Sequence, residues 1–207
     1  MKDKLIELQN LFLEGNYEEA LNRSRNLRAS LKKSVHFWAF IGACEFKTQK
    51  LVEAEKSLRY ALSLDKKNFD ANNNLGSLLF ENSSYEEAER YLKIAIEADS
   101  ASADAVYNLG KVYRAQDRLH DAKTCFEEAI RINPAMAFAH NNLANCLKTE
   151  GDVEGSIASY RRAVACNDQF RIAKWNLSLA LLKNEEYEEG YHYYYYGFDL
   201  NTHHAEV

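Results

Sequence analysis

Apolar residues recur along this chain at helical spacing, and the whole pattern repeats every 34 residues. The segment "FDANNNLGSLLFENSSYEEAERYLKIAIEAD" from Phe69 aligns without a gap with "ADAVYNLGKVYRAQDRLHDAKTCFEEAIRINP" from Ala103. The repeat predicts pairs of helices joined by short turns. The same register accounts for 204 of the 207 residues, as a single array followed by a tail at 205–207. The six predicted repeats are residues 1–34, 35–68, 69–102, 103–136, 137–170 and 171–204.

Residue size follows the position in the repeat, and this predicts how the two helices of a repeat pack. The eighth position is always small from the second repeat onward: Gly42, Gly76, Gly110, Ala144 and Ser178. The twentieth is also small: Ala20, Ala54, Ala88, Ala122, Ser156 and Gly190. Small side chains there let the two helices approach closely. Large residues at the seventh and twenty-fourth positions fill the layer between helices: Ile41, Leu75, Leu109, Leu143 and Leu177, then Leu58, Leu92, Phe126, Tyr160 and Tyr194.

The fourth repeat carries a known signature. V-x-x-L-G-x-x-Y runs from Val106 to Tyr113 and is followed by Ala122, Phe126 and Pro134. This motif resembles the tetratricopeptide (TPR) signature, and the resemblance covers nearly the whole chain. It implies an all-α, right-handed α-solenoid of six helix–turn–helix units. Such an array has an extended concave surface, lined by the first helix of each repeat, that binds and does not usually catalyse.

The first repeat departs from this pattern, as expected for a capping unit. Glu7 and Leu8 replace the large–small pair, and Ser24 replaces the large residue at the twenty-fourth position. The segment "EGNYEEAL" from Glu14 to Leu21 nevertheless keeps the turn and predicts a second helix.

Positions 2, 5, 6, 9, 12 and 13 form a stripe on the side of the first helix that faces away from the second. Position 6 is Asn74, Asn108, Asn142 and Asn176 in four consecutive repeats. An asparagine amide has an acceptor and two donors, so a row of them is predicted to hold the backbone of an extended peptide. The row resembles the asparagine ladder of O-linked N-acetylglucosamine transferases. The alternative is structural, since asparagine is also common at this position in ordinary TPR repeats.

Further candidate binding residues surround this row: Asn73, Tyr107, Asn141, Lys111, Arg114, Asn145 and Lys148. Acidic residues such as Asp70 and Asp104 lie in the earlier repeats and basic residues in the later ones, which favours an acidic partner segment for the later half. The alternative is ordinary solvated surface charge. Position 5 lacks the basic residues of chaperone-binding TPR proteins, so chaperone-tail binding is not predicted: Ala39, Asn73, Tyr107, Asn141 and Trp175.

Composition excludes several other classes of protein. The net charge of −5 argues against sequence-independent nucleic-acid binding, which depends on basic clusters. No apolar run is long enough to span a bilayer, so the chain is expected to be cytoplasmic, with no membrane partner. No glycine-rich phosphate loop or metal-ligand spacing occurs, so neither a cofactor nor a metal is expected and the protein is predicted not to be an enzyme. The four cysteines, Cys44, Cys125, Cys146 and Cys166, are predicted to be reduced packing residues.

Two classes of function remain, a scaffold that binds a peptide or protein partner in its groove and a docking module of a transferase system. The second rests on the last repeat, "NLSLALLKNEEYEEGYHYYYYGF", which resembles the final TPR unit of bacterial TPR-linked glycosyltransferases. Glu189, Gly190, Tyr191 and Tyr194 keep the frame of that segment. Only nine residues follow Phe198, so the catalytic domain of such a system is expected on another chain or removed.

The aromatic segment "YHYYYYGF", residues 191–198, fits the second helix of the sixth repeat. Its register favours a helix over a strand, a membrane anchor or a base-stacking platform. Several of its tyrosines are not required by the repeat, and tyrosine suits an interface that is apolar yet tolerates water. We therefore expect a self-association or partner surface at Tyr191, Tyr195 and Phe198, and either a homodimer or dependence on a partner through the C-terminal repeat.

Overall fold

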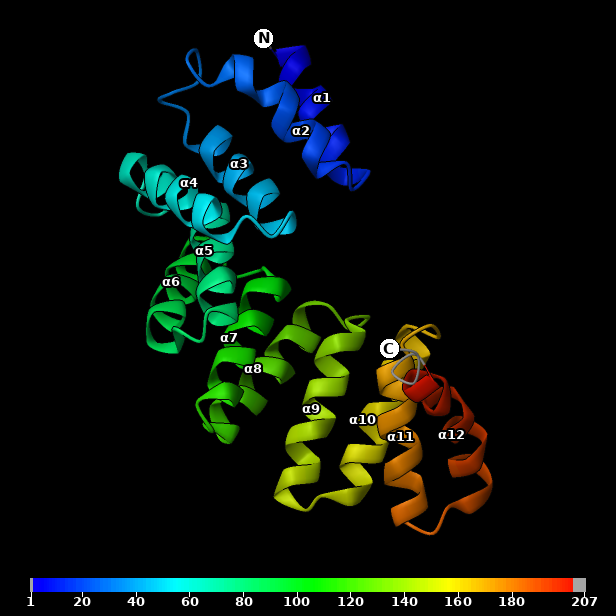
Figure 1. The fold of residues 1–207 in the computed structure, drawn as a ribbon. Coiled ribbons are helices and arrows are strands. Elements are labelled where there is room, and N and C mark those ends of the chain that lie inside the picture. The colour runs from blue at the N-terminus through cyan, green and yellow to red at the C-terminus, as the bar shows by residue number, and fades with distance from the viewer. Residues whose placement is uncertain (1, 203–207) are drawn as a thin grey trace. The chain divides into compact units, whose positions relative to one another are not determined.

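The computed structural model describes the backbone of residues 2–202 and the side chains of residues 4–195. All regular elements in this part of the chain are helices (Figure 1). They are α1 (Lys2–Leu13), α2 (Tyr17–Ser24), a short 3-10 helix (Arg25–Leu27), α3 (Val35–Lys47), α4 (Leu51–Leu64), α5 (Phe69–Glu81), α6 (Tyr85–Ala98), α7 (Ala103–Ala115), α8 (Leu119–Ile132), α9 (Ala137–Glu150), α10 (Val153–Cys166), α11 (Arg171–Lys183) and α12 (Tyr187–Thr202). The predicted all-α repeat fold is confirmed. Within residues 2–202 the helices lack the length and apolar content of a membrane-spanning segment.

The chain divides into two compact units, an N-terminal half of residues 1–112 and a C-terminal half of residues 113–207. In the N-terminal half, α1 pairs with α2, α3 with α4 and α5 with α6. In the C-terminal half, α9 pairs with α10 and α11 with α12, and α8 packs on α9. Figure 1 shows the two helices of each pair side by side and joined by a short turn. Each half is therefore a stack of helix hairpins.

The close approach within a hairpin depends on the small residue at the eighth position. A Cβ atom added at Gly42 would lie 2.5 Å from Leu58 Cγ, and one at Gly76 would lie 2.6 Å from Leu92 Cγ. Both leucines are fully buried and have no room to retreat. The glycines therefore set the distance between the two helices, as predicted.

The predicted packing positions form the core. In the second to fifth repeats the following residues at the twentieth, twenty-fourth and twenty-seventh positions are completely buried, whereas Tyr194 of the sixth repeat is half-buried: Ala54, Ala88, Ala122, Leu58, Leu92, Phe126, Tyr160, Ala61, Ala95, Ala129 and Ala163. Leu143, at the seventh position, differs because it is only half-buried. The first repeat also differs: α2 ends at Ser24, and a 3-10 turn follows where the other repeats continue their second helix. Ser24 is buried, but its hydroxyl bonds the Leu21 carbonyl instead of filling the layer.

The cysteines follow the predicted packing role in part. Cys44 and Cys146 are buried, Cys125 is half-buried, and none of the four forms a disulfide within the described residues. Burial raises the pKa of the Cys44 thiol to about 12 and also raises the pKa of Cys146, so both stay protonated and inert. The prediction is wrong for Cys166, which is exposed because it lies at the last residue of α10.

The residue before each first helix changes character along the chain. Ser34, Asn68 and Ser102 cap α3, α5 and α7, since each side-chain oxygen accepts a backbone N–H three residues later. Met136 and Phe170 precede α9 and α11, and neither provides a side-chain cap. An apolar residue in place of a polar cap typically costs about 1 kcal/mol. In the C-terminal half, α9 and α11 therefore begin without the stabilisation that a polar cap provides.

Every hairpin turn uses the same backbone geometry. The fifteenth residue of each repeat has a positive φ, between 59° and 86°, and lies in the left-handed region: Gly15, Gln49, Ser83, Asp117, Gly151 and Glu185. Glycine adopts this conformation without penalty, whereas other residues pay a steric cost. No atom lies within 4 Å of a Cβ built on Gly15 or Gly151, so only the backbone resists a side chain there.

We expect Gly151→Ala to destabilise the protein by about 1 kcal/mol. Alanine tolerates the left-handed region poorly, and its methyl group would gain no packing contact in return. Gly151→Asn should cost less, since asparagine visits this region more readily. Glu185→Gly should stabilise the same turn of the next repeat. Urea unfolding followed by circular dichroism measures all three; an alanine variant as stable as the wild type would contradict the strain at this position.

Candidate functional site

The residues at positions 2, 5, 6, 9, 12 and 13 of each first helix, here called the first-helix strip, carry two matching amide pairs. In the N-terminal half, Asn108 Nδ2 donates to Asn73 Oδ1 at 3.2 Å. In the C-terminal half, Asn176 Nδ2 donates to Asn141 Oδ1 at 3.0 Å. Both bonds join position 6 of one repeat to position 5 of the repeat before it. Two members of the asparagine row, Asn108 and Asn176, are therefore braced by an asparagine of the preceding repeat.

The other two asparagines of position 6 have different surroundings. Asn142 Oδ1 accepts a bond from Arg114 Nη1, at position 12 of the preceding repeat, at 2.9 Å. Asn74 follows a repeat with Ala39 at position 5, and its side chain makes no hydrogen bond within the described residues. All four repeats therefore carry an asparagine at position 6, but the hydrogen-bond partners of these asparagines differ.

Burial separates the members of the row that can touch a partner from those that brace it. Asn141 and Asn142 are only 6% and 8% exposed, whereas Asn74, Asn108 and Asn176 are half-buried. An amide that donates one N–H to a neighbour keeps its second N–H and its oxygen for other bonds. Because the bond fixes the orientation of the amide, Asn108 and Asn176 present these groups at little further entropic cost.

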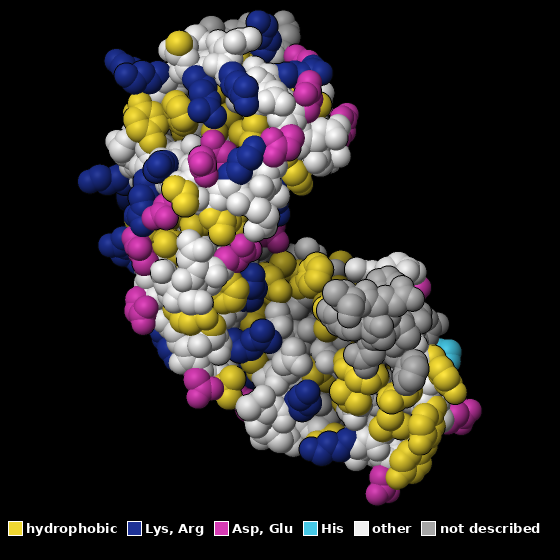
Figure 2. Space-filling view, in the orientation of Figure 1, with side chains coloured by type: hydrophobic (Ala, Val, Ile, Leu, Met, Phe, Trp, Pro, Cys, Tyr) yellow, Lys and Arg dark blue, Asp and Glu magenta, His cyan; other side chains and the backbone are white. Residues whose placement is uncertain are grey.

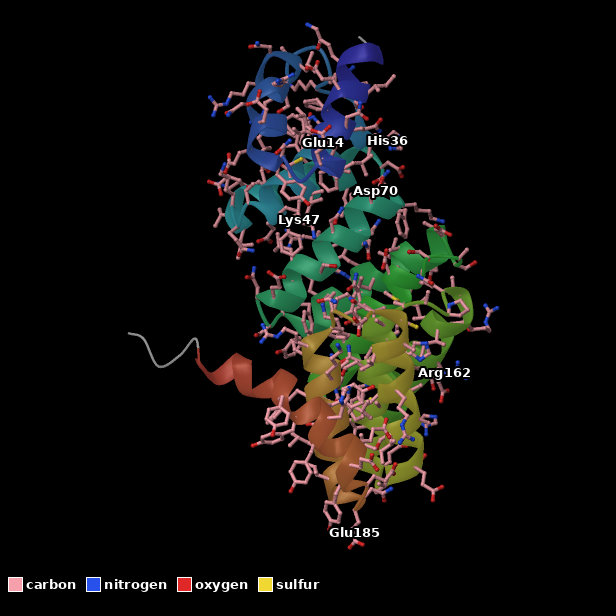
Figure 3. All side chains as sticks on the ribbon, turned by 90° about the vertical axis from the view of Figure 1, so that its right-hand side faces the viewer. Glu14, His36, Lys47, Asp70, Arg162 and Glu185 are labelled. Carbon is pink, nitrogen blue, oxygen red and sulfur yellow. The ribbon has the colours of Figure 1, made fainter. Side chains whose placement is uncertain are left out.

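The N-terminal half holds its one predicted cation against aromatic rings. Lys111 Nζ lies 4.5 Å from the ring centroid of Phe80 and 5.8 Å from that of Tyr107, which is cation–π geometry. In the same half, His36 and Asp70 lie in the first turns of α3 and α5, while Lys47 ends α3 (Figure 3). The strip of this half therefore carries residues of both signs, Asp70 on α5 and Lys47 on α3.

In the C-terminal half, Asn145 and Lys148 lie on the strip of α9. Tyr160 donates its hydroxyl proton to Asn145 Oδ1 at 2.6 Å, and burial raises the pKa of Tyr160 to about 12, so this hydroxyl remains a donor at neutral pH. The amide of Asn145 is oriented by the second helix of its own repeat. Lys148 is exposed and forms no ion pair with the described residues.

Apolar residues also lie on the strip of the C-terminal half, and the sequence reasoning missed them. Phe138 and Ile172, both at position 2, are 52% and 54% exposed, and Leu179 at position 9 is 42% exposed. The Phe138 ring packs edge-on against Phe170 at 4.7 Å between centroids. The available signal was the change at position 2 from charged residues in the earlier repeats to apolar ones in the last two.

The aromatic segment is helical, as predicted, and its tyrosines divide between two roles. Tyr194 packs on Trp175 with 5.4 Å between ring centroids, and Tyr193 packs against the core. Tyr191 and Tyr195 are 56% and 76% exposed, and Tyr187, which lies four residues before Tyr191, is 55% exposed. Three tyrosines spaced by four therefore share one outward face of α12. The side chain of Phe198, the third predicted residue of this surface, lies outside the described residues.

The helix hairpins and the first-helix strip define a tetratricopeptide repeat protein, and residues 107–170 match the family profile described as "Tetratricopeptide repeat". Residues 14–133 match the profile described as "Cilia and flagella-associated protein 70 middle TPR-like domain". That match covers more than half of the chain, so the chain belongs to this family of TPR-like domains. Comparison with curated proteins gives no match.

Several solved TPR structures are similar to the chain. PilF of Pseudomonas aeruginosa is 21% identical, with a TM-score of 0.85 over 100% of this chain and 92% of that one. PilW, described as a "widely conserved type IV pilus biogenesis factor", is 17% identical, with a TM-score of 0.82 over 93% and 89% of the two chains. YrrB, described as "a TPR protein with an unusual peptide-binding site", is 18% identical, with a TM-score of 0.67 over 87% and 93%. At these identities the similarity shows the fold alone.

The bond between Asn141 and Asn176 should be measurable as a coupling energy. In a double-mutant cycle with Asn141→Ala and Asn176→Ala, we expect a coupling of about 1 kcal/mol in the free energy of unfolding. Asn74→Ala, which removes no hydrogen bond, is the matched control and should change stability by less than about 0.5 kcal/mol. Additive effects of the two alanine substitutions would show that the bracing bond contributes nothing.

Proposed function

We propose that the protein is a non-catalytic scaffold that binds an extended peptide segment of a partner protein along its first-helix strip. The observation that carries this proposal is the braced amide row, in which Asn108 and Asn176 are held by hydrogen bonds to asparagines of the preceding repeats. Fixed amides with an unused donor and acceptor match the backbone N–H and C=O of an extended chain. A cytoplasmic location and the absence of catalysis remain predictions.

The remaining predicted residues support this surface in different ways. Asn141 braces Asn176, and Asn142, which is almost fully buried, accepts a hydrogen bond from Arg114. Lys111 offers a cation whose position is set by the aromatic rings of Phe80 and Tyr107. Arg114 and Lys148 supply positive charge in the C-terminal half. Within each half, a partner segment would therefore meet amides, and in the C-terminal half it would also meet the cations of Arg114 and Lys148.

The amide row should be tested with peptides selected from a displayed random library against the wild-type chain. We expect the triple variant Asn74→Ala, Asn108→Ala and Asn176→Ala to weaken every selected peptide about tenfold, since amides that contact backbone act regardless of side-chain sequence. Fluorescence polarisation measures the affinity, and circular dichroism checks that helicity is kept. The matched control replaces the exposed asparagines Asn22, Asn26 and Asn82, which lie outside the strip. Equal affinity for the two triple variants would refute the amide row as a binding device.

A second surface is proposed at the outward face of α12, where a second copy of the chain would pack against Tyr187, Tyr191 and Tyr195. All three are more than half exposed and share one helical face. Large exposed aromatic side chains that line up in this way are typical of interfaces. Self-association through this face accounts for tyrosines that the repeat itself does not need.

Tyr191→Ser and Tyr195→Ser together should convert a dimer into a monomer in multi-angle light scattering at micromolar concentration. The second helix of this repeat should stay folded, because neither side chain packs in the core. Val52→Ser removes an equally exposed apolar side chain from α4 and should leave the oligomeric state unchanged. A wild-type chain that is already monomeric under these conditions would remove the proposal.

The alternative function is a docking module of a glycosyltransferase-type system. It rests on the resemblance of the last repeat to the final TPR unit of such enzymes. The matching family profiles and the solved structures described above are TPR proteins, and none of their descriptions names a transferase. The scaffold function therefore has the stronger support.

A further inference from the structure

The first-helix strip of the C-terminal half carries three parallel bands of different chemistry. Each band consists of residues at the same or adjacent positions of neighbouring first helices, so its members lie at nearly the same level along those helices. The apolar band is Phe138 and Ile172 at position 2; the amide band is Asn176 at position 6, held by its brace Asn141, next to the nearly buried Asn142; the basic band is Arg114, Lys148 and Lys183 at positions 12 and 13. This arrangement is absent from the sequence of the earlier repeats, where position 2 is His36, Asp70 and Asp104.

The three bands lie within reach of a single extended chain. Four residues of helix separate positions 2 and 6, which corresponds to about 6 Å, and six residues separate positions 6 and 12, about 9 Å. Successive side chains of an extended strand point to opposite sides of its backbone. A strand that follows the amide band across α9 and α11 therefore directs alternate side chains toward the apolar band and toward the basic band.

The basic band is not neutralised from within the strip. Lys148 and Lys183 are exposed and form no ion pair with the described residues, and Arg114 bonds a neutral amide. None of the strip residues of α9 and α11 is an Asp or Glu, whereas α5 carries Asp70 and Glu81 on its strip. Figure 2 shows Lys and Arg side chains set among hydrophobic and neutral surface in the lower part of the view. In a chain of net charge −5, this local excess of cations selects for a partner with negative charge.

The apolar band exists at the expense of local stability. Met136 and Phe170 occupy cap positions where the earlier repeats place Ser34 and Asn68, and the Phe170 ring supports the exposed ring of Phe138. Local rules are broken in this way most often at functional sites. An exposed apolar edge of this kind is suited to apolar side chains of a partner.

We propose that the C-terminal half selects extended segments in which apolar and acidic residues alternate. This inference rests on the proposed function and specifies its ligand class. The backbone of the segment pairs with the amide band, its apolar side chains contact Phe138 and Ile172, and its carboxylates contact Lys148 and Lys183. A segment with the same composition in two blocks places half of its side chains against the wrong band and binds weakly.

The test uses fluorescein-labelled synthetic peptides and the full chain. The first probe alternates leucine and glutamate, the second has the same residues as a leucine block followed by a glutamate block, and the third alternates leucine and lysine. We expect the alternating Leu–Glu peptide to bind at least about tenfold more tightly than either of the others in fluorescence polarisation. Equal binding of the alternating and block peptides, or of the Leu–Glu and Leu–Lys peptides, overturns the proposal.

Charge reversal provides a second measurement with a matched control. Lys148→Glu should weaken the alternating Leu–Glu peptide about fivefold to tenfold, and the loss should shrink as salt is raised. Arg162→Glu makes the same change of charge on α10, where Arg162 is exposed outside the strip, and should leave binding unchanged (Figure 3). Equal losses in the two variants would mean that only net charge is sensed, which contradicts a specific basic band.

The outcomes separate this inference from the function on which it rests. If the alternating peptide does not bind, while peptides selected from a random library bind and depend on Asn74, Asn108 and Asn176, the inference fails and the scaffold function stands. If the selected peptides are also indifferent to these asparagines, the proposed function fails as well.

Discussion

The close approach of the two helices within each repeat is the constraint on which the rest of the molecule depends. At Gly42 and Gly76 a side chain would overlap a leucine of the facing helix, and both leucines are completely enclosed. A fixed distance between the helices fixes the stacking of one hairpin on the next. Stacking in turn decides which residues of successive first helices become neighbours, because packed interiors do not adjust continuously.

The amide pairs are a direct consequence of this regular stacking. Asn73 and Asn108 are separated by the same number of residues as Asn141 and Asn176, and both pairs form the same hydrogen bond although they lie in different halves of the chain. Where position 5 is Tyr107, the next asparagine takes Arg114 as its partner. Asparagine at both positions therefore gives the same bond in each half, whereas the bond of Asn142 comes from position 12 of the preceding repeat.

Much of the fold follows from the sequence because the same pattern of small, large and polar positions recurs from repeat to repeat. Helix starts at Val35, Phe69 and Ala137 coincide with the start of the 34-residue register. The features that differ depend on contacts beyond one period. The short α2 and the exposure of Cys166 reflect local departures at helix ends, where packing no longer enforces the pattern.

The sequence predicts which positions line the candidate site, but it does not predict which of these residues contact a partner and which only hold their neighbours in place. Counting residues places Asn141 and Asn176 on the same stripe, but it does not reveal that one braces the other and is itself nearly buried. The same count puts Lys111 among the basic residues without indicating that its amine lies over the Phe80 ring. Such roles are set by side-chain rotamers and distances between repeats, which a periodic pattern leaves open.

The two halves differ in the residue that precedes each first helix. This residue affects both the stability of the helix and the surface that the helix offers to a partner. A polar cap satisfies the free N–H groups of the first turn and favours the helix, as at Ser34 and Asn68. An apolar residue at the same position offers those groups no side-chain acceptor, as at Phe170, whose ring packs against the core and the exposed Phe138 instead. The fold tolerates this loss because hairpin packing, rather than capping, holds each repeat. A repeat array can therefore vary its helix starts to change what it binds while its core stays the same.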